Sequence, residues 1–309
     1  MFSFWELLLQ QVVNGLILGS FYALVALGYS MVYGIIKLFN FAHGDIYMTG
    51  AFVCLSIFGI LSGVIPGWPG IILSILAAMC LSGGLGFLAQ RFAYRPMLNA
   101  PRLSLLITAL GVSLVLYNSA MVISSSRPYF FHSGLDNAAG LQFGNLSITY
   151  IQIILLAVSA ACMVGLTLFI KKTMIGKAMR AISLDQDTCR LMGINVHSVI
   201  GLTFFIGSAL AAVAGGLYCV YYGNVQYNMG YLFGIKAFTA AVIGGIGSIP
   251  GAMLGGLLLG LLEALGTQVI TQFGVSGSAW KDVFAFGVLI LILILRPNGL
   301  LGKTEIERM

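Results

Sequence analysis

Long apolar segments alternate with short polar ones along almost the whole chain. Residues 46–90, 137–170 and 191–235 contain no Asp, Glu, Lys or Arg. A stretch of this kind holds one or two spans of about 20 residues, the length that crosses a roughly 30 Å hydrocarbon core. Its apolar positions are continuous rather than alternating, which favours helices over barrel strands. The pattern predicts an all-α polytopic membrane protein, with one transmembrane domain over residues 1–309.

The apolar segments predict eight full transmembrane helices, or nine if a short segment near 236–250 also crosses. That segment ends in Gly244, Gly245, Gly247 and Pro250. We therefore predict a short or re-entrant helix there, because broken backbone is tolerated at membrane depth only where protein or a cavity surrounds it. The eight full segments are 11–33, one ending near 61, 71–92, 103–123, 148–170, 199–221, one ending near 271, and 283–295.

Small residues recur every four positions on three of the predicted helices. Such rows let helix backbones approach closely in lipid, so we expect each row to form a helix–helix contact. The rows are Gly15-Gly19-Ala23, Gly207-Ala211-Gly215, and the adjacent pair Gly247-Gly251-Gly255 and Ser248-Ala252-Gly256-Gly260.

Composition excludes a soluble protein. Only 8% of the residues are charged, 59% are hydrophobic and the mean hydropathy is +1.01, whereas soluble domains average about 25% charged. The net charge of +6 comes from short loops, where the positive-inside rule explains it without nucleic-acid binding. This rule places Arg91, Arg95 and Arg102 in the cytoplasm together with 171–198. We expect a multi-pass protein of the bacterial inner (plasma) membrane.

The sequence contains no motif for covalent chemistry. Five scattered cysteines and three distant histidines suggest neither a disulfide framework nor a metal site. The glycine-rich run that ends at Gly251 fails the dinucleotide pattern, because Pro250 occupies a required glycine position. We expect no enzymatic activity, no bound metal and no cofactor in this chain.

The segment 171–198 is the most polar part of the chain, with five of the fifteen Lys and Arg residues. It has helical character, and we expect one small apolar face opposite a charged face. Such an amphipathic segment suits docking into a groove on a soluble partner or lying on anionic lipid. The expected apolar face comprises Met179, Ile182, Leu191 and Met192, and the charged face comprises Lys177, Arg180, Asp185, Asp187 and Arg190.

Ionisable residues inside the apolar segments are candidates for function, because burying them in lipid costs a few kcal/mol. Glu263 can line a solute path, or it can fix helix packing through an interhelical bond. His43 and Asp45 can form a polar patch near the mouth of a pathway, or an interfacial turn. For Lys236 we expect an ammonium group that extends to the membrane interface.

Four collinear motifs resemble the LivH-type permease subunits of the branched-chain amino acid ABC importer family. They are Asn40–Asp45, Gly176–Ala181 with Asp185, Leu191–Ile194, and Lys236–Ala252. The resemblance covers essentially the whole chain and implies a single permease domain whose segment 171–198 is a cytoplasmic coupling segment. The implied coupling residues are Gly176, Lys177, Ala178, Arg180, Ala181, Asp185, Arg190 and Gly193.

The same resemblance implies partners. These are a second permease subunit of LivM type, two ABC ATPase subunits that bind the ATP, and an extracytoplasmic substrate-binding protein. It leaves the solute open, since urea and amide permeases of the superfamily share the pattern, and Asp45 stands where the family often has Glu. From the residues alone, an ion-coupled secondary transporter or a passive channel also stays open. The candidate solute-pathway residues are Asn40, His43, Asp45, Thr239, Gly244, Gly245 and Glu263.

Overall fold

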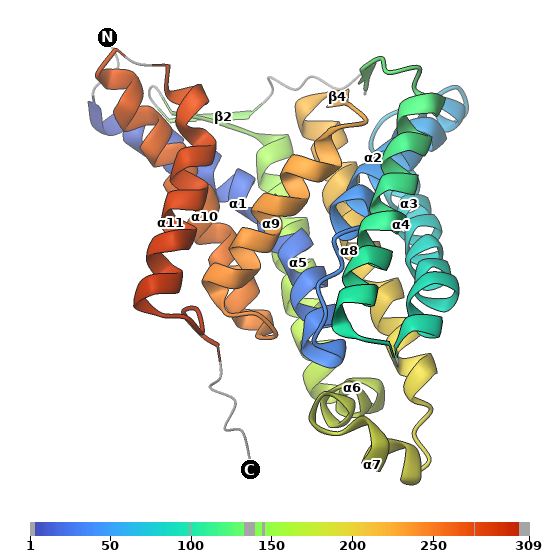
Figure 1. Ribbon diagram of the computed structural model, residues 1–309. Coiled ribbons are helices and arrows are strands. Elements are labelled where there is room, and N and C mark those ends of the chain that lie inside the picture. The colour runs from blue at the N-terminus through green and yellow to red at the C-terminus, as the bar shows by residue number, and fades with distance from the viewer. Residues whose placement is uncertain (1–3, 99, 133–139, 144–145, 275, 303–309) are drawn as a thin grey trace.

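Eleven α-helices dominate the computed structural model, which describes residues 4–98, 100–132, 140–143, 146–274 and 276–302 (Figure 1). Two short antiparallel strand pairs, β1 with β4 and β2 with β3, join loops at one end of the helices. The elements are α1 (Phe4–Ile36), α2 (His43–Leu61), α3 (Trp68–Ala89), the π-helical turn η1 (Gln90–Tyr94), the short turn η2 (Arg95–Met97), α4 (Arg102–Ile123), β1 (Tyr129–Phe130), β2 (Gly140–Phe143), β3 (Leu146–Thr149), α5 (Tyr150–Lys172), α6 (Met174–Leu184), α7 (Gln186–Leu191), α8 (Val196–Tyr222), β4 (Asn224–Val225), α9 (Met229–Gly244), α10 (Ile249–Gln272), η3 (Gly277–Trp280) and α11 (Lys281–Leu295).

The predicted fold class is confirmed. Seven described helices are long and apolar enough to cross a membrane, namely α1, α2, α3, α4, α5, α8 and α10. The apolar helices α9 and α11 are shorter, at 16 and 15 residues. The predicted short apolar helix is confirmed as α9, and Figure 1 shows α9, α10 and α11 running in alternating directions along the same body. The short helix begins at Met229 instead of near 236.

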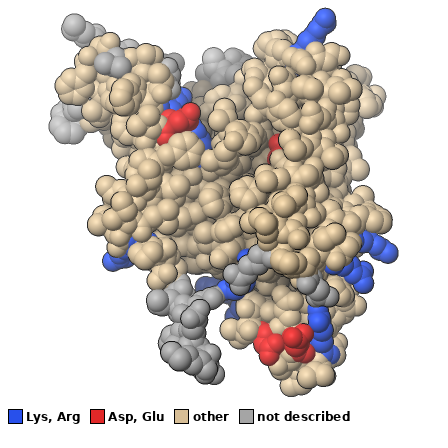
Figure 2. Space-filling model, viewed as in Figure 1, with Lys and Arg blue, Asp and Glu red and all other residues tan. Residues whose placement is uncertain are grey.

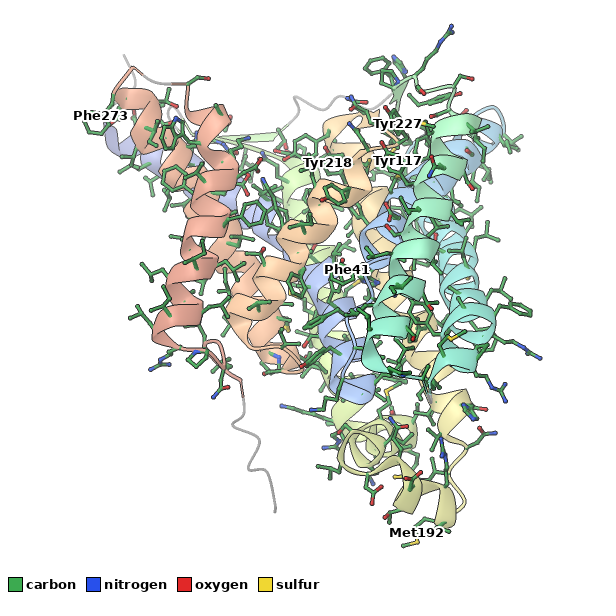
Figure 3. All side chains as sticks on the ribbon, viewed as in Figure 1. Phe41, Tyr117, Met192, Tyr218, Tyr227 and Phe273 are labelled. Atoms are coloured by element: carbon green, nitrogen blue, oxygen red, sulfur yellow. The ribbon has the colours of Figure 1, made fainter. Side chains whose placement is uncertain are left out.

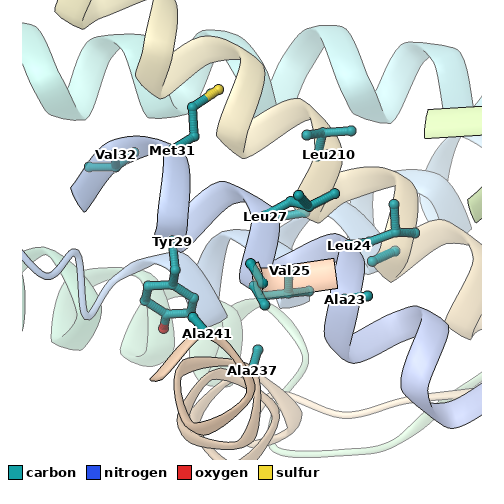
Figure 4. Packing of buried hydrophobic residues seen from close by; sticks show 14 of the residues in the cluster. Ala23, Leu24, Val25, Leu27, Tyr29, Met31, Val32, Leu210, Ala237 and Ala241 are labelled. Atoms are coloured by element: carbon teal, nitrogen blue, oxygen red, sulfur yellow. The ribbon is translucent and has the colours of Figure 1, made fainter. Parts of the chain in front are cut away.

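Helix α1 forms the centre of the bundle. In its most apolar window 89% of the residues are buried, against 6% for α4. A helix that is apolar on all sides can face protein or lipid, and here burial assigns α1 to the core and α4 to the periphery. Figure 4 shows α1 packed against Leu210 of α8 and against Ala237 and Ala241 of α9.

The crossing that contains α2 is only partly helical. After Ile36 the chain turns at Lys37, which has a positive φ of 58°. Residues 37–42 then follow the bundle in irregular conformation before α2 begins at His43 (Figure 1). Figure 3 places Phe41 near the middle of the helical body. We expected broken backbone near 236–250 and only a short polar interruption here, but this is the segment where irregular backbone enters the bundle.

The turn between α9 and α10 explains the glycine run. Gly245 and Gly247 have φ values of 105° and 85°, which side chains with a Cβ rarely adopt. The turn is also paired with the C-terminal segment, because the N–H groups of Leu300 and Leu301 donate to the carbonyls of Ile243 and Gly244, each over 2.9 Å. These bonds use carbonyls that the end of a helix leaves without partners.

The predicted rows of small residues lie at close helix contacts. A Cβ added at Gly15 would lie 2.9 Å from the Cα of Leu261, and one added at Gly19 would lie 2.8 Å from the Cα of Leu257. The α10 row of Gly256 and Gly260 packs on α1, the row of Gly251 and Gly255 packs on α9, and the α8 row of Gly207 and Gly215 packs on α1 and α2.

Replacing Gly260 by valine is expected to destabilise the fold, because the added side chain meets the backbone of α1 and forces the two helices apart. Overpacking of this kind costs about 1–3 kcal/mol. The measurement is the unfolding midpoint in a denaturing-detergent titration. Gly111→Val on α4 is the matched control, since a Cβ there meets nothing within 4 Å. Equal midpoints for the two variants would contradict the close α1–α10 contact.

Candidate functional site

The first turn of α2 carries a buried carboxylate with one oxygen free. Asp45 is 3% exposed, and its Oδ2 accepts a 2.5 Å hydrogen bond from the hydroxyl of Ser113 on α4. Its Oδ1 has no hydrogen-bond partner among the described residues and faces α9, where a Cβ added at Gly230 would lie 2.9 Å away. A helix N-terminus stabilises an acidic side chain, but a buried acceptor without a donor is costly. The arrangement is suited to receiving a cationic or donor group.

Two tyrosines lie beside this carboxylate. Tyr117 follows Ser113 by one turn of α4 and lies within electrostatic range of Asp45. Its ring is 5.5 Å from that of Tyr227, which precedes α9, and Figure 3 shows both labels close together. We call Asp45, Ser113, Tyr117 and Tyr227 the Asp45 site. Sequence reasoning found only Asp45, because serine and tyrosine within an apolar segment carry no signal of their own.

The neighbouring candidates face other parts of the protein. The His43 side chain points to α1, where its Nε2 lies against Gly28 and the ring hydrogen-bonds the backbone of Val25. Asn40 accepts a 2.6 Å hydrogen bond from the Tyr94 hydroxyl of η1. His43 and Asp45 both begin α2, but they point to different helices, so the structure does not bring them together in one polar patch.

The candidates on α9 are spread along that helix. Thr239 is fully buried, and its hydroxyl has no partner among the described residues. Gly244 and Gly245 lie in the turn at the end of α9, against Gly251 and the C-terminal segment. The structure does not bring these three residues to the Asp45 site, so their place in a solute pathway stays a prediction.

Glu263 of α10 forms a bonded network with three other helices. Its Oε2 accepts from the Tyr22 hydroxyl over 2.9 Å, and its Oε1 accepts from the Lys236 ammonium over 2.8 Å. Lys236 also pairs with Asp282 of α11 at 2.8 Å. This geometry matches the packing interpretation of Glu263. Lys236 is 12% exposed and held by two carboxylates, of which Asp282 is 55% exposed, so the reach of its ammonium group to the interface stays a prediction.

The segment 171–198 projects as α6 and α7 beyond the ends of the other helices (Figure 1). Gly176 is buried against Ile170, where a Cβ has no room, and its N–H donates to the Thr173 hydroxyl over 3.0 Å. Lys177 is exposed, and the Arg180 guanidinium donates to the Lys171 carbonyl over 3.4 Å. Ala178 and Ala181 are half-buried on the same helix.

Asp185 separates the two helices by capping α7. Its Oδ1 accepts from the N–H groups of Asp187 and Thr188 over 2.9 and 3.2 Å, and its Oδ2 accepts from the Thr188 hydroxyl. The hydroxyl bond, followed by the two backbone bonds, lowers the pKa of Asp185. The cap therefore contributes stability above the ordinary Asp pKa, and this contribution is lost as the pH falls through the lowered value. Arg190 pairs with Asp187 at 3.1 Å, and Gly193 ends the segment with a φ of 81°.

The expected single apolar face of this segment is wrong. Met179 and Ile182 are buried against the bundle, whereas Leu191 and Met192 are 88% and 78% exposed. The break at Asp185 is the cause, because it turns α7 away from the face that α6 presents to the protein. Leu184 is 88% exposed as well, and Figure 3 places Met192 at the extreme end of the molecule. We call Leu184, Leu191 and Met192 the apolar tip.

Positive charge accompanies the apolar tip. On the face shown in Figure 2, most Lys and Arg side chains lie toward the end from which α6 and α7 project. This agrees with placing that end in the cytoplasm. Among the described residues, no three His, Cys, Asp or Glu side chains lie close enough together to hold a metal ion.

Comparison with known proteins identifies the class and then the family. A solved ABC transporter of metal-chelate type, in an inward-facing conformation, covers 92% of this chain and 85% of its own, with a TM-score of 0.51 at 15% identity. This likeness shows the fold alone. The model of the family "Branched-chain amino acid transport system / permease component" matches residues 11–293.

Two relatives agree with the family match over nearly their whole length. The high-affinity branched-chain amino acid transport system permease protein BraD of Pseudomonas aeruginosa is 46% identical, covering 97% of each chain. The corresponding protein LivH of Escherichia coli K12 is 43% identical, again over 97% of each chain. The chain therefore belongs to the family of branched-chain amino acid transport permeases and is a multi-pass membrane protein.

Replacing Glu263 by glutamine is expected to lower stability, because the Lys236 ammonium then keeps only the half-exposed Asp282 as a partner. Unpairing a buried charge costs about 3–5 kcal/mol, and the remaining pair makes the lower end the expected value. The measurement is thermal unfolding in detergent. Asp187→Asn is the control, since it breaks an exposed pair whose worth is about 0–1 kcal/mol. Two equally stable variants would show that Glu263 does not hold the helices together.

Proposed function

We propose that this chain is a permease subunit of an ATP-driven importer of branched-chain or related hydrophobic amino acids in the bacterial inner membrane. The observation that carries the proposal is the projecting helical pair with its apolar tip, on a chain that belongs to this permease family. Exposed leucine and methionine at the end of a short helix suit a groove on a soluble protein. The chain itself performs no covalent step, and ATP is bound by its partners.

In this proposal the apolar tip seats on two soluble ATPase subunits, and Lys177, Arg180 and Arg190 border the contact. Large exposed apolar side chains favour docking to protein over remaining in water. The alternative of lying on anionic lipid requires the tip to reach the bilayer surface, whereas the tip projects away from the ends of the membrane helices (Figure 1). A second permease subunit of LivM type and an extracytoplasmic binding protein complete the importer.

The solute pathway in this proposal passes the Asp45 site, between α4 and α9. An amino acid carries an ammonium group that can pair with the free Oδ1 of Asp45, and the rings of Tyr117 and Tyr227 can contact an apolar side chain. The α4 row of Leu103, Ile107 and Leu114 is 67%, 61% and 61% exposed. The second permease subunit would cover this face and close the pathway.

The apolar tip gives a first test. Leu191→Asp is expected to weaken co-purification of the ATPase subunits about thirtyfold, the effect of losing one hot-spot residue at an interface. The fold stays intact, because the side chain is 88% exposed. Val64→Asp is the matched control, since Val64 is 80% exposed in the turn between α2 and α3, away from α6 and α7. Undiminished ATPase binding by Leu191→Asp would overturn the docking role.

The Asp45 site gives a second test. Asp45→Asn is expected to reduce ATP-driven leucine uptake by the assembled importer at least about tenfold, since a charge-assisted bond is worth roughly 1.5–3 kcal/mol. Assembly and ATPase binding are expected to be unchanged. Ser113→Ala, which removes only the bond to Oδ2, is expected to have a smaller effect. Normal uptake by Asp45→Asn in proteoliposomes would exclude this carboxylate from the pathway.

A further inference from the structure

A polar cavity lies away from the Asp45 site, where α3 ends and α8 begins. It has a volume of about 500 Å³ and is lined by both helices and by η1 and η2. Its cationic and polar wall includes Arg91, Arg95 and His197. Its apolar wall includes Phe87 and Phe205. The cavity sits at the ends of two membrane spans, at the same end of the molecule as α6 and α7.

The charge of this cavity is uncompensated. Arg91 and Arg95 are exposed, and among the described residues neither is within salt-bridge distance of a carboxylate. His197 lies within range of the positive charges of Arg95 and Arg190. The residues that line the cavity include no Asp or Glu. Neighbouring cationic side chains without a counter-ion favour an anionic ligand. The planar guanidinium group of arginine can donate two parallel hydrogen bonds to phosphate oxygens.

A buried amide supports the presence of a ligand. Gln90 is 2% exposed and lines the cavity, yet its Nε2 has no hydrogen-bond partner among the described residues. A buried donor without an acceptor is costly, so an acceptor from a ligand would remove this penalty. Gln90 begins the π-helical turn η1, and single π-turns of this kind are frequent at functional sites.

We propose that this cavity binds the phosphate headgroup of an anionic phospholipid. The combination of a cationic rim and a wall of phenylalanines distinguishes a lipid from a free phosphate, because an acyl chain can lie along Phe87 and Phe205 while the headgroup meets the arginines. Basic pockets between transmembrane helices on the cytoplasmic side are suited to such headgroups. The bound lipid would tie the start of α8, and so the end of the coupling segment at Gly193, to the bilayer.

The test measures lipid retained by the full-length chain in detergent by native mass spectrometry. The probes are phosphatidylglycerol, phosphatidylcholine and inorganic phosphate. We expect about one phosphatidylglycerol to be retained per chain, with phosphatidylcholine bound weakly and inorganic phosphate unable to displace the lipid. Arg91→Gln combined with Arg95→Gln is expected to weaken binding about thirtyfold, because each cation near an anionic lipid contributes about fivefold.

Two further variants separate a built site from general surface charge. Gln90→Leu keeps the net charge and is expected to weaken phosphatidylglycerol binding about tenfold, through one lost bond to a charged group. Arg127→Gln removes a charge from the opposite end of the molecule and is expected to leave binding unchanged.

Three outcomes would overturn the proposal. The first is an equal loss of lipid in Arg127→Gln and in the double arginine variant. The second is displacement of the lipid by inorganic phosphate. The third is a double arginine variant that retains lipid but loses the ATPase subunits, since the cavity would then be a protein contact.

Discussion

In a bilayer, every irregular stretch of backbone must find its hydrogen-bond partners inside the protein. Two such stretches occur here, residues 37–42 and the turn between α9 and α10, and both depend on the close packing around α1. Because glycine rows bring α10 against α1 and α9, these helices form a continuous wall. Against that wall the chain leaves helical conformation with Asn40 and Ala42 buried. The same packing allows α2 to begin inside the bundle, where its first turn presents Asp45.

The sequence was sufficient to predict what depends on local composition. Apolar length determines which segments cross the membrane, and small-residue spacing determines which helix faces approach, so the fold class and the glycine contacts were predicted correctly. The short apolar helix was also predicted, and it is α9 (Met229–Gly244), but the irregular segment 37–42 was not. Glycines at 244–247 suggested a break but form a tight turn, whereas the actual break begins at Lys37, a residue with no special preference for positive φ. Its conformation is imposed by surrounding helices that are distant in sequence.

Site residues were harder to predict, because their roles depend on partners from other helices. Glu263 and Asp45 give the same signal in the sequence, an acidic residue in an apolar segment. In the structure both carboxylate oxygens of Glu263 are bonded, while one oxygen of Asp45 has no partner in the described part of the chain. The partners Lys236 and Asp282 reach each other only through the packing of α9, α10 and α11. The positions of these residues along the sequence do not predict that contact.

The projecting segment 171–198 and the Asp45 site lie far apart, yet one helix, α1, lies between them. Met179 and Arg180 of α6 share a small cavity with Gly34 near the end of α1 and with Gly247 of the α9–α10 turn. A force applied to α6 therefore acts on the end of α1, where only the six residues 37–42 separate it from α2. A closely packed helix such as α1 transmits a displacement because the protein interior around it has low compressibility. An irregular segment, by contrast, can change its backbone torsion angles at low cost. Motion of α6 would thus be converted into a change at the start of α2, which is the part of the bundle that positions the free oxygen of Asp45.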